Sequence, residues 1–213
     1  MLSVSGVLRD AAQLYQALFW RTLVMAALVF SIVCLAETVG PWPVVLLSMI
    51  GTSVVQGALV EAVELERERR SGSIASLLRA AWRRAGALFG VSLLTGIGVG
   101  IGLFLLVVPG LILFTRWSLA VPAVMLEGRS PRAAMRRSAE LVKGHGWQVF
   151  AIFLTVTAGA FGTSFVLERL LAGPLGLWAA LTLAATLTTP FAAHALNVVY
   201  YRIVDPGRPV LQA

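Results

Sequence analysis

The sequence predicts an all-α protein, an integral membrane bundle of six transmembrane helices with amphipathic helices at its cytoplasmic surface. Hydrophobic residues make up 58% of the 213 residues and charged residues only 13%, against roughly half and a quarter in soluble domains. The mean hydropathy of +0.86 agrees with this. Because a soluble fold of this size could not bury so much apolar surface, we expect lipid to surround much of the chain.

The expected spans are runs of about 20 largely apolar residues, the length that crosses a bilayer as a helix. Chain breakers such as PWP at 41–43 and Pro109-Gly110 separate these runs. We find no alternating strand pattern, and helices satisfy their own backbone groups in lipid. We therefore predict one membrane domain over residues 1–213, with spans at about 19–37, 44–63, 87–108, 111–126, 147–167 and 175–201.

The basic residues are distributed unevenly along this arrangement. An even number of spans puts both termini on one side of the membrane. Of the 17 Lys and Arg residues, only Arg116 and Arg169 fall outside the segments on that side. Because Lys and Arg accumulate in cytoplasmic segments, we assign that side, with both termini, to the cytoplasm.

Basic amphipathic stretches precede three of the expected spans, at about 5–17, 73–85 and 131–143. Such helices lie in the headgroup plane, where anionic lipid attracts each nearby cation. The expected contacts with headgroups are Arg79, Arg83, Arg132, Arg136, Arg137 and Lys143. The alternative interpretation is that these residues only follow the positive-inside rule as solvated linkers. Nucleic-acid binding is not expected, because aromatic interleaving and a recognised fold are both missing.

These three stretches also form a weak internal repeat. The segments SVSGVLRDAAQLYQALFW, SGSIASLLRAAWRRAGALF and GRSPRAAMRRSAELVKGHGWQVF each combine Ser, Gly, basic residues and aromatic residues. The sequence leaves open whether they reflect a true triplication.

Four polar residues within the expected spans are candidates for function. Arg116 lies about six residues past Pro109-Gly110; it either faces the bundle, with Glu37 or Glu168 as partners, or extends to the outer interface. His194 and Asn197 share a helix face in the sixth span, and Gln56 lies in the second. These three residues either bind a headgroup or relay a proton, or they form interhelical hydrogen bonds.

The segment GIGVGIG contains Gly96, Gly98, Gly100 and Gly102. It lacks the strand and the Lys-Ser/Thr of a nucleotide-binding loop. In a span, Gly96 with Gly100 and Gly98 with Gly102 form small-x-x-x-small faces for helix packing. The sequence has two His, one Cys and no enzyme signature that we recognise, so we expect no metal, no cofactor and no catalytic activity.

The segment PGLILFTRWSLAVPAVMLEGRSPRAAMRRSAELVKGHGWQVF, residues 109–150, resembles a bacterial family of six-span membrane proteins. This family includes the membrane domain attached to some glycerophosphoryl diester phosphodiesterases and the YciC-like inner-membrane proteins. The shared features are Pro-Gly at a span turn, Arg-Trp, Glu-Gly, and an Arg-Arg-Ser helix closing on Gly and Trp. The resemblance implies a helical domain of the bacterial inner membrane, without the soluble domain that holds the phosphodiesterase active site.

Together these features favour a non-enzymatic inner-membrane protein, a scaffold or accessory subunit that contacts anionic lipids through its basic helices. Membrane lipids are the expected partners, and other membrane proteins or self-association are further options. The main alternative is a transporter or channel for a lipid or small solute that uses Arg116 and the intramembrane polar residues. A membrane-embedded lipid-modifying enzyme is the weaker alternative.

Overall fold

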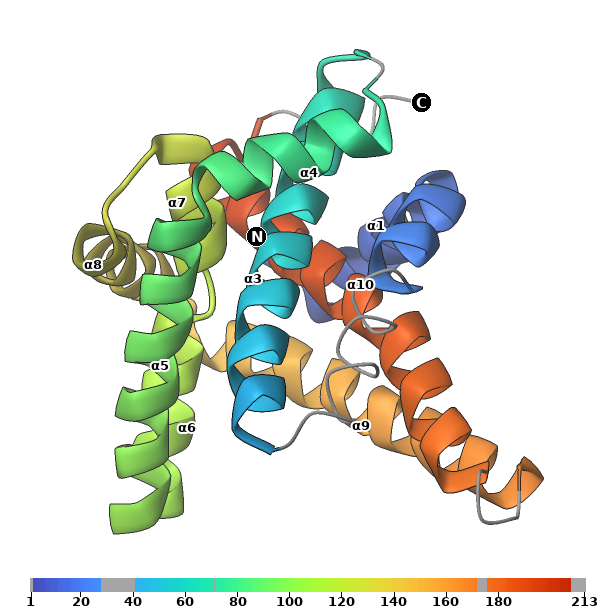
Figure 1. The fold of residues 1–213 in the computed structure, drawn as a ribbon. Coiled ribbons are helices and arrows are strands. Elements are labelled where there is room, and N and C mark those ends of the chain that lie inside the picture. The colour runs from blue at the N-terminus through green and yellow to red at the C-terminus, as the bar shows by residue number, and fades with distance from the viewer. Residues whose placement is uncertain (1, 28–40, 71, 172–175, 208–213) are drawn as a thin grey trace.

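The computed structural model describes residues 2–27, 41–70, 72–171 and 176–207 (Figure 1). The regular structure of these residues is helical throughout, without a strand among them. The long helices are α3 (Pro41–Arg67), α5 (Ala85–Leu105), α9 (Gly146–Leu170) and α10 (Gly176–Val204). The shorter helices are α1 (Val4–Ala17), α4 (Ile74–Arg83), α6 (Val107–Trp117), α7 (Ala120–Glu127) and α8 (Pro131–Val142).

Two antiparallel hairpins flank the central helix α3. Figure 1 shows α5 and α6 side by side in one hairpin and α9 and α10 side by side in the other. The helix α3 contacts α5, α7 and α10, so it joins the two hairpins. The short helices α1, α4 and α8 lie in the upper part of the view, whereas the lower part holds the long helices and α6.

Three helical segments in the described part of the chain are long and apolar enough to cross a membrane: Ala85–Leu105, Val107–Glu127 and Gly146–Leu170. They correspond to the third, fourth and fifth predicted spans. The helices α3 and α10 cover the second and sixth, and residues 19–27 at the start of the first are helical. Residues 28–37 of the first span lie outside the described residues.

Large apolar side chains cover the outside of these helices. Phe104, at the end of α5, is 92% exposed, and Ile97, Ile112, Phe161 and Phe165 are exposed as well. Water would make so large an apolar surface unfavourable, whereas hydrocarbon is its natural environment.

The turn between α5 and α6 corrects the prediction that Pro109-Gly110 separates two spans. The chain turns at Leu106, which is extended (φ −162°, ψ 138°), and Pro109 lies in the first turn of α6. A proline is tolerated there because the first N–H groups of a helix have no intrahelical acceptor.

A second interruption separates α6 from α7 at Ser118 and Leu119. It lies four residues before Pro122, which cannot donate to the Ser118 carbonyl and whose ring crowds that carbonyl. Pro122 thus breaks the fourth predicted span into two helices. Pro190 instead lies within the continuous helix α10.

The three short helices α1, α4 and α8 share one register. Their N-cap residues are Ser3, Ser73 and Ser130. Buried residues follow four positions later (Val7, Leu77, Ala134) and eight positions later (Ala11, Ala81, Ser138). Exposed arginines lie six positions after the serines (Arg9, Arg79, Arg136). The weak sequence repeat therefore has a matching structural register.

The buried faces of these helices contact the protein itself. The helix α8 packs on α5, α6 and α7, α4 packs on α3 and α5, and α1 packs on α9 and α10. The sequence predicted that their apolar faces enter the headgroup layer. In the structure the buried residues of the shared register pack within the protein, and the exposed faces opposite them carry Arg9, Arg79 and Arg136.

Candidate functional site

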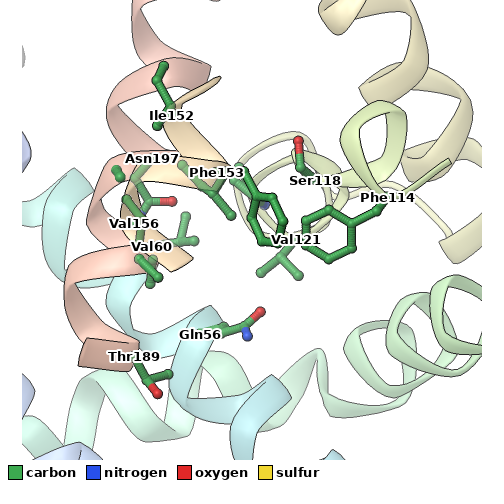
Figure 2. Close-up of a pocket in the computed structure, with 15 residues that line it drawn as sticks. Gln56, Val60, Phe114, Ser118, Val121, Ile152, Phe153, Val156, Thr189 and Asn197 are labelled. Carbon is green, nitrogen blue, oxygen red and sulfur yellow. The ribbon is translucent and has the colours of Figure 1, made fainter. Parts of the chain in front are cut away.

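A cavity of about 170 Å³ lies between α3, α6, α7, α9 and α10 (Figure 2). Its wall is mostly apolar and includes the Phe114 and Phe153 rings, whose centroids are 4.3 Å apart. Gln56 of α3 and Asn197 of α10 extend toward the space beside these rings, and Ser118 lines it at the break between α6 and α7. The described lining carries no ionisable side chain.

Asn197 is only 2% exposed, and its amide nitrogen has no hydrogen-bond partner among the described residues. One turn earlier on α10, His194 is fully buried beside the Tyr15 ring, and both of its ring nitrogens likewise lack a partner there. Interhelical hydrogen bonds were one of the two roles that the sequence left open for these residues. The described contacts supply none, so the buried polar groups need another explanation.

Arg116 does not line this cavity. Its side chain is exposed near the end of α6, and its carbonyl accepts a hydrogen bond from the Ser138 hydroxyl of α8 (2.7 Å). Because α6 begins at Val107, Arg116 lies ~14 Å along the helix from the α5–α6 turn. It is therefore beside the basic helix α8, which corrects its predicted position near the opposite end. Of its two expected partners, Glu37 lies outside the described residues, and Glu168 is not paired with it.

Glu127, the last residue of α7, is the centre of a network that we call the Glu127 cluster (Glu127, Arg129, Arg137 and Tyr200). Its Oε1 accepts hydrogen bonds from the Tyr200 hydroxyl (2.7 Å) and from Arg137 Nε (3.0 Å). Its Oε2 accepts one from Arg129 Nε (2.5 Å). The hydrogen bond to Glu127 also raises the pKa of Arg137 above its ordinary value. This carboxylate therefore ties α7, α8 and α10 together.

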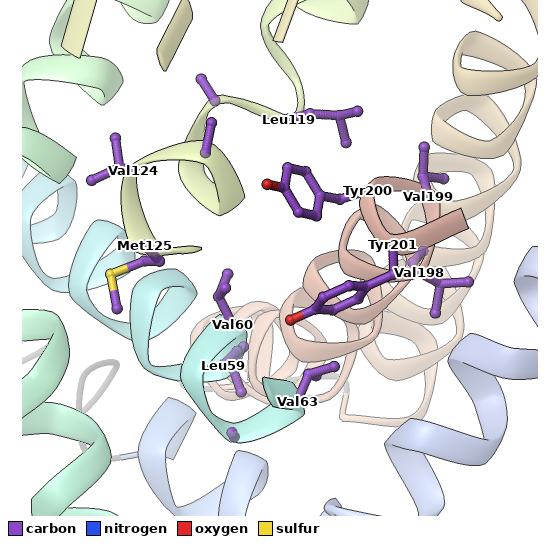
Figure 3. Close-up of a cluster of buried hydrophobic side chains, with 14 of the residues drawn as sticks. Leu59, Val60, Val63, Leu119, Val124, Met125, Val198, Val199, Tyr200 and Tyr201 are labelled. Carbon is purple, nitrogen blue, oxygen red and sulfur yellow. The ribbon is translucent and has the colours of Figure 1, made fainter. Parts of the chain in front are cut away.

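The residues next to Tyr200 make two further connections. Figure 3 shows Tyr200 and Tyr201 side by side on α10, with Tyr200 directed toward α7 and Tyr201 toward α3. The Tyr201 hydroxyl donates to Glu64 of α3, and the Arg67 guanidinium stacks over the Tyr201 ring at 3.8 Å. Arg202 donates to Asp10 of α1 (2.7 Å). Three consecutive residues of α10 thus hold α7, α3 and α1.

Ser138 of α8 stabilises the break between α6 and α7. Its hydroxyl donates to the Arg116 carbonyl (2.7 Å) and accepts from the Leu119 amide (3.0 Å). Both are backbone groups that the interrupted helix leaves without their usual partners. At the other end of α7, Arg84 donates to the Val124 carbonyl (2.7 Å), beside Gly128, which has a left-handed backbone (φ +66°).

The predicted headgroup-binding residues lie in three kinds of surroundings. Arg137 is engaged by Glu127 and keeps 30% of its side chain exposed, so its contact with a headgroup stays a prediction. Arg136 is 77% exposed and lies 3.8 Å from Glu140. The remaining members form no ion pair with any described residue and are exposed: Arg79, Arg83, Arg132 and Lys143.

The four candidate glycines lie on two opposite faces of α5, and only one of these faces packs against α6. A Cβ on Gly98 would lie 2.4 Å from the Trp117 ring, and one on Gly102 would lie 2.8 Å from the Gly110 Cα. These two let α5 approach α6 closely. Gly96 and Gly100 meet no described atom within 4 Å. Their predicted packing role is therefore not seen within the chain, because they lie on the opposite face of α5.

Sequence reasoning did not single out Tyr200, Tyr201, Glu127, Ser138 or Arg84 as site residues. The available signals were the pair of tyrosines at the end of a span and the Glu-Gly and Arg-Arg-Ser motifs. Nothing in the sequence showed that Tyr201 meets Glu64, which is 137 positions away.

The apolar exterior, the membrane-length helices and the charged network at one end of the bundle define the class: this is an all-helical membrane protein. Residues 89–203, more than half of the chain, match the family described as the membrane domain of glycerophosphoryl diester phosphodiesterase. The chain belongs to that family, as the Glu-Gly and Arg-Arg-Ser motifs implied. The matched region runs from α5 through α10 and contains the whole Glu127 cluster.

No curated protein and no solved structure matches the chain.

Proposed function

We propose that this chain is a non-enzymatic scaffold or accessory domain of a bacterial inner membrane. It selects anionic lipids through the basic faces of α1, α4 and α8, and both termini lie on the cytoplasmic side. The observation that carries this proposal is the shared register of the three helices, in which Arg9, Arg79 and Arg136 occupy equivalent exposed positions.

The charges near these helices support the proposal, because four of the acids there are engaged by arginines. Asp10, Glu64, Glu127 and Asp205 each pair with an arginine of the described part. Arg9, Arg79, Arg83, Arg132 and Lys143 have no acidic partner there. A surface with unpaired cations attracts lipid phosphates, with ~1 kcal/mol for each Lys or Arg near the membrane.

Exposed tryptophans accompany the same helices. Trp20 follows α1, Trp82 lies at the end of α4, and Trp147 lies at the start of α9 after α8. Tryptophan prefers the boundary between headgroups and hydrocarbon. Each basic face therefore has an aromatic anchor close to it, as expected of a helix at the membrane surface.

A scaffold role also agrees with the use of the carboxylates. Glu127 accepts three hydrogen bonds, and Glu64 and Asp10 hold tyrosine or arginine side chains of α10. These carboxylates connect helices, and their oxygens already accept hydrogen bonds from other side chains of the protein.

The proposal can be tested with the full chain in phosphatidylcholine vesicles that contain spin-labelled phosphatidylglycerol or spin-labelled phosphatidylcholine. Electron paramagnetic resonance measures how strongly the protein restricts each lipid. We expect phosphatidylglycerol to be preferred, and added salt to weaken the preference.

The decisive variant replaces Arg9, Arg79 and Arg136 together by glutamine. Removal of three cations near the surface should cost up to ~3 kcal/mol of lipid selectivity. The matched control is Arg169→Gln, an exposed arginine near the end of α9 that stacks on Phe165. A preference that survives both the triple substitution and high salt would contradict the proposal.

A further inference from the structure

The cavity in Figure 2 carries a second inference, independent of the basic faces of α1, α4 and α8. It joins a mostly apolar wall to two carboxamide side chains, Gln56 and Asn197, that come from different helices. The amide nitrogen of Asn197 is buried without a partner among the described residues. That nitrogen is closed off from the cavity, so an occupant would hydrogen-bond with the side-chain oxygen of Asn197 and with the amide of Gln56.

The described lining excludes an ionised occupant. Its polar members are the amides and the hydroxyls of Ser118 and Thr189, with no basic or acidic side chain among them. A phosphate or an ammonium group would lose its hydration there without gaining a counter-charge. An uncharged group that both donates and accepts hydrogen bonds matches these side chains, since the Asn197 oxygen is an acceptor and the Gln56 amide carries both a donor and an acceptor.

Size and access point to the bilayer as the source of the occupant. A cavity of about 150 Å³ accepts a molecule the size of benzene, so about 170 Å³ has room for a compact group of similar size. The Phe114 and Phe153 rings line the cavity from α6 and α9, both within candidate membrane spans, and are partly exposed. A lipid in the hydrocarbon layer can therefore reach the space between these helices.

We propose that the cavity binds an uncharged glycerolipid of the diacylglycerol class. Its hydroxyl and ester carbonyls form hydrogen bonds with Gln56 and Asn197. Its acyl chains leave past Phe114 and Phe153 into the bilayer. This site differs from the anionic-lipid surface in both its residues and its preferred charge.

The full chain in phosphatidylcholine vesicles provides the test, with a diacylglycerol that carries a photoactivatable diazirine on one acyl chain. Crosslinking should saturate with increasing probe and should map to peptides containing Phe114 or Phe153. Unlabelled diacylglycerol should compete, and phosphatidylglycerol with the same chains should compete at least tenfold less well.

Asn197→Leu and Gln56→Leu keep the approximate side-chain volume and remove the hydrogen-bonding groups. Each should weaken binding of the probe about fivefold to tenfold, the loss expected for a net hydrogen bond. Thr186→Val is the control, because Thr186 lies on α10 outside this lining. Among the described residues its hydroxyl bonds to its own helix alone, at the Thr182 carbonyl (2.7 Å). If Asn197→Leu does not fold, Gln56→Leu provides the test, because Gln56 is partly exposed.

Three results would overturn the inference: no saturable crosslinking, equal binding by the leucine variants and Thr186→Val, or equal competition by phosphatidylglycerol. The vesicles contain no anionic lipid, so such a failure would leave the proposed function of the basic helices standing. Conversely, loss of phosphatidylglycerol selectivity would not affect the cavity result.

Discussion

Tyr200→Phe tests the network that holds the end of the bundle together. The substitution removes one hydroxyl and leaves the ring, which is buried at 3% exposure, in place. The lost hydrogen bond joins the hydroxyl to Glu127 Oε1 at 2.7 Å. Hydrogen bonds to charged groups contribute about 1.5–3 kcal/mol. Glu127 keeps two guanidinium donors, so we expect the lower end, about 1.5 kcal/mol of unfolding free energy.

Reversible unfolding by SDS in mixed micelles, followed by tryptophan fluorescence, measures this difference. Tyr15→Phe is the matched control, because the Tyr15 hydroxyl forms no hydrogen bond with the described residues. It should change the unfolding free energy by less than about 0.5 kcal/mol. Equal effects of the two substitutions would refute the assigned role of Tyr200.

A double-mutant cycle extends the same test to the shared acceptor atom. Tyr200 and Arg137 both donate to Glu127 Oε1. Tyr200→Phe and Arg137→Gln should therefore show a coupling energy of at least about 0.5 kcal/mol. Additive effects would mean that the two side chains act independently.

Three further predictions use the same unfolding measurement. Gly98→Ala should destabilise the protein by about 1–3 kcal/mol, because its Cβ would meet Trp117. Gly96→Ala should stabilise it by about 0.5–1 kcal/mol, because a Cβ at Gly96 would lie in open space. Equal effects of the two substitutions would contradict the assigned faces of α5. Ser138→Ala should cost about 1–3 kcal/mol, because two backbone groups at the α6–α7 break lose their partner; a neutral result would exclude that role. Gly128→Ala should lower the unfolding free energy by about 1–2 kcal/mol, because only glycine adopts this left-handed backbone conformation freely. An unchanged midpoint of SDS unfolding would contradict this.

Local sequence patterns predicted the short helices well. The stretches 5–17, 73–85 and 131–143 differ by at most two residues at either end from α1, α4 and α8. Their signals are local: a serine at the N-cap, apolar residues at helical spacing, and Gly144 with a positive φ of 88° after α8. Such signals do not depend on the rest of the fold.

The position of the α5–α6 turn could not be predicted in this way. Pro-Gly usually marks a turn, but the third residue of a helix accepts proline equally well. The chain therefore turns three residues before Pro109, and the apolar run gives no sign of it. The displaced turn also changes the depth assigned to Arg116.

The candidate site was predicted only in its parts. Gln56 and Asn197 were recognised as polar residues within predicted spans, because such residues are costly in lipid. That they line one cavity depends on how α3 packs against α10. The Glu127 cluster likewise joins residues separated by 73 positions, which a single sequence does not reveal.

The central claim is that the helices cross a membrane with the basic short helices on the cytoplasmic side. It can be tested in intact cells by thiol labelling, after Cys34, the single cysteine, is replaced by serine. A membrane-impermeant maleimide should label Leu106→Cys, at the α5–α6 turn, in intact cells. It should label Ala133→Cys, on α8, only after permeabilisation. Labelling of Ala133→Cys in intact cells would contradict the account.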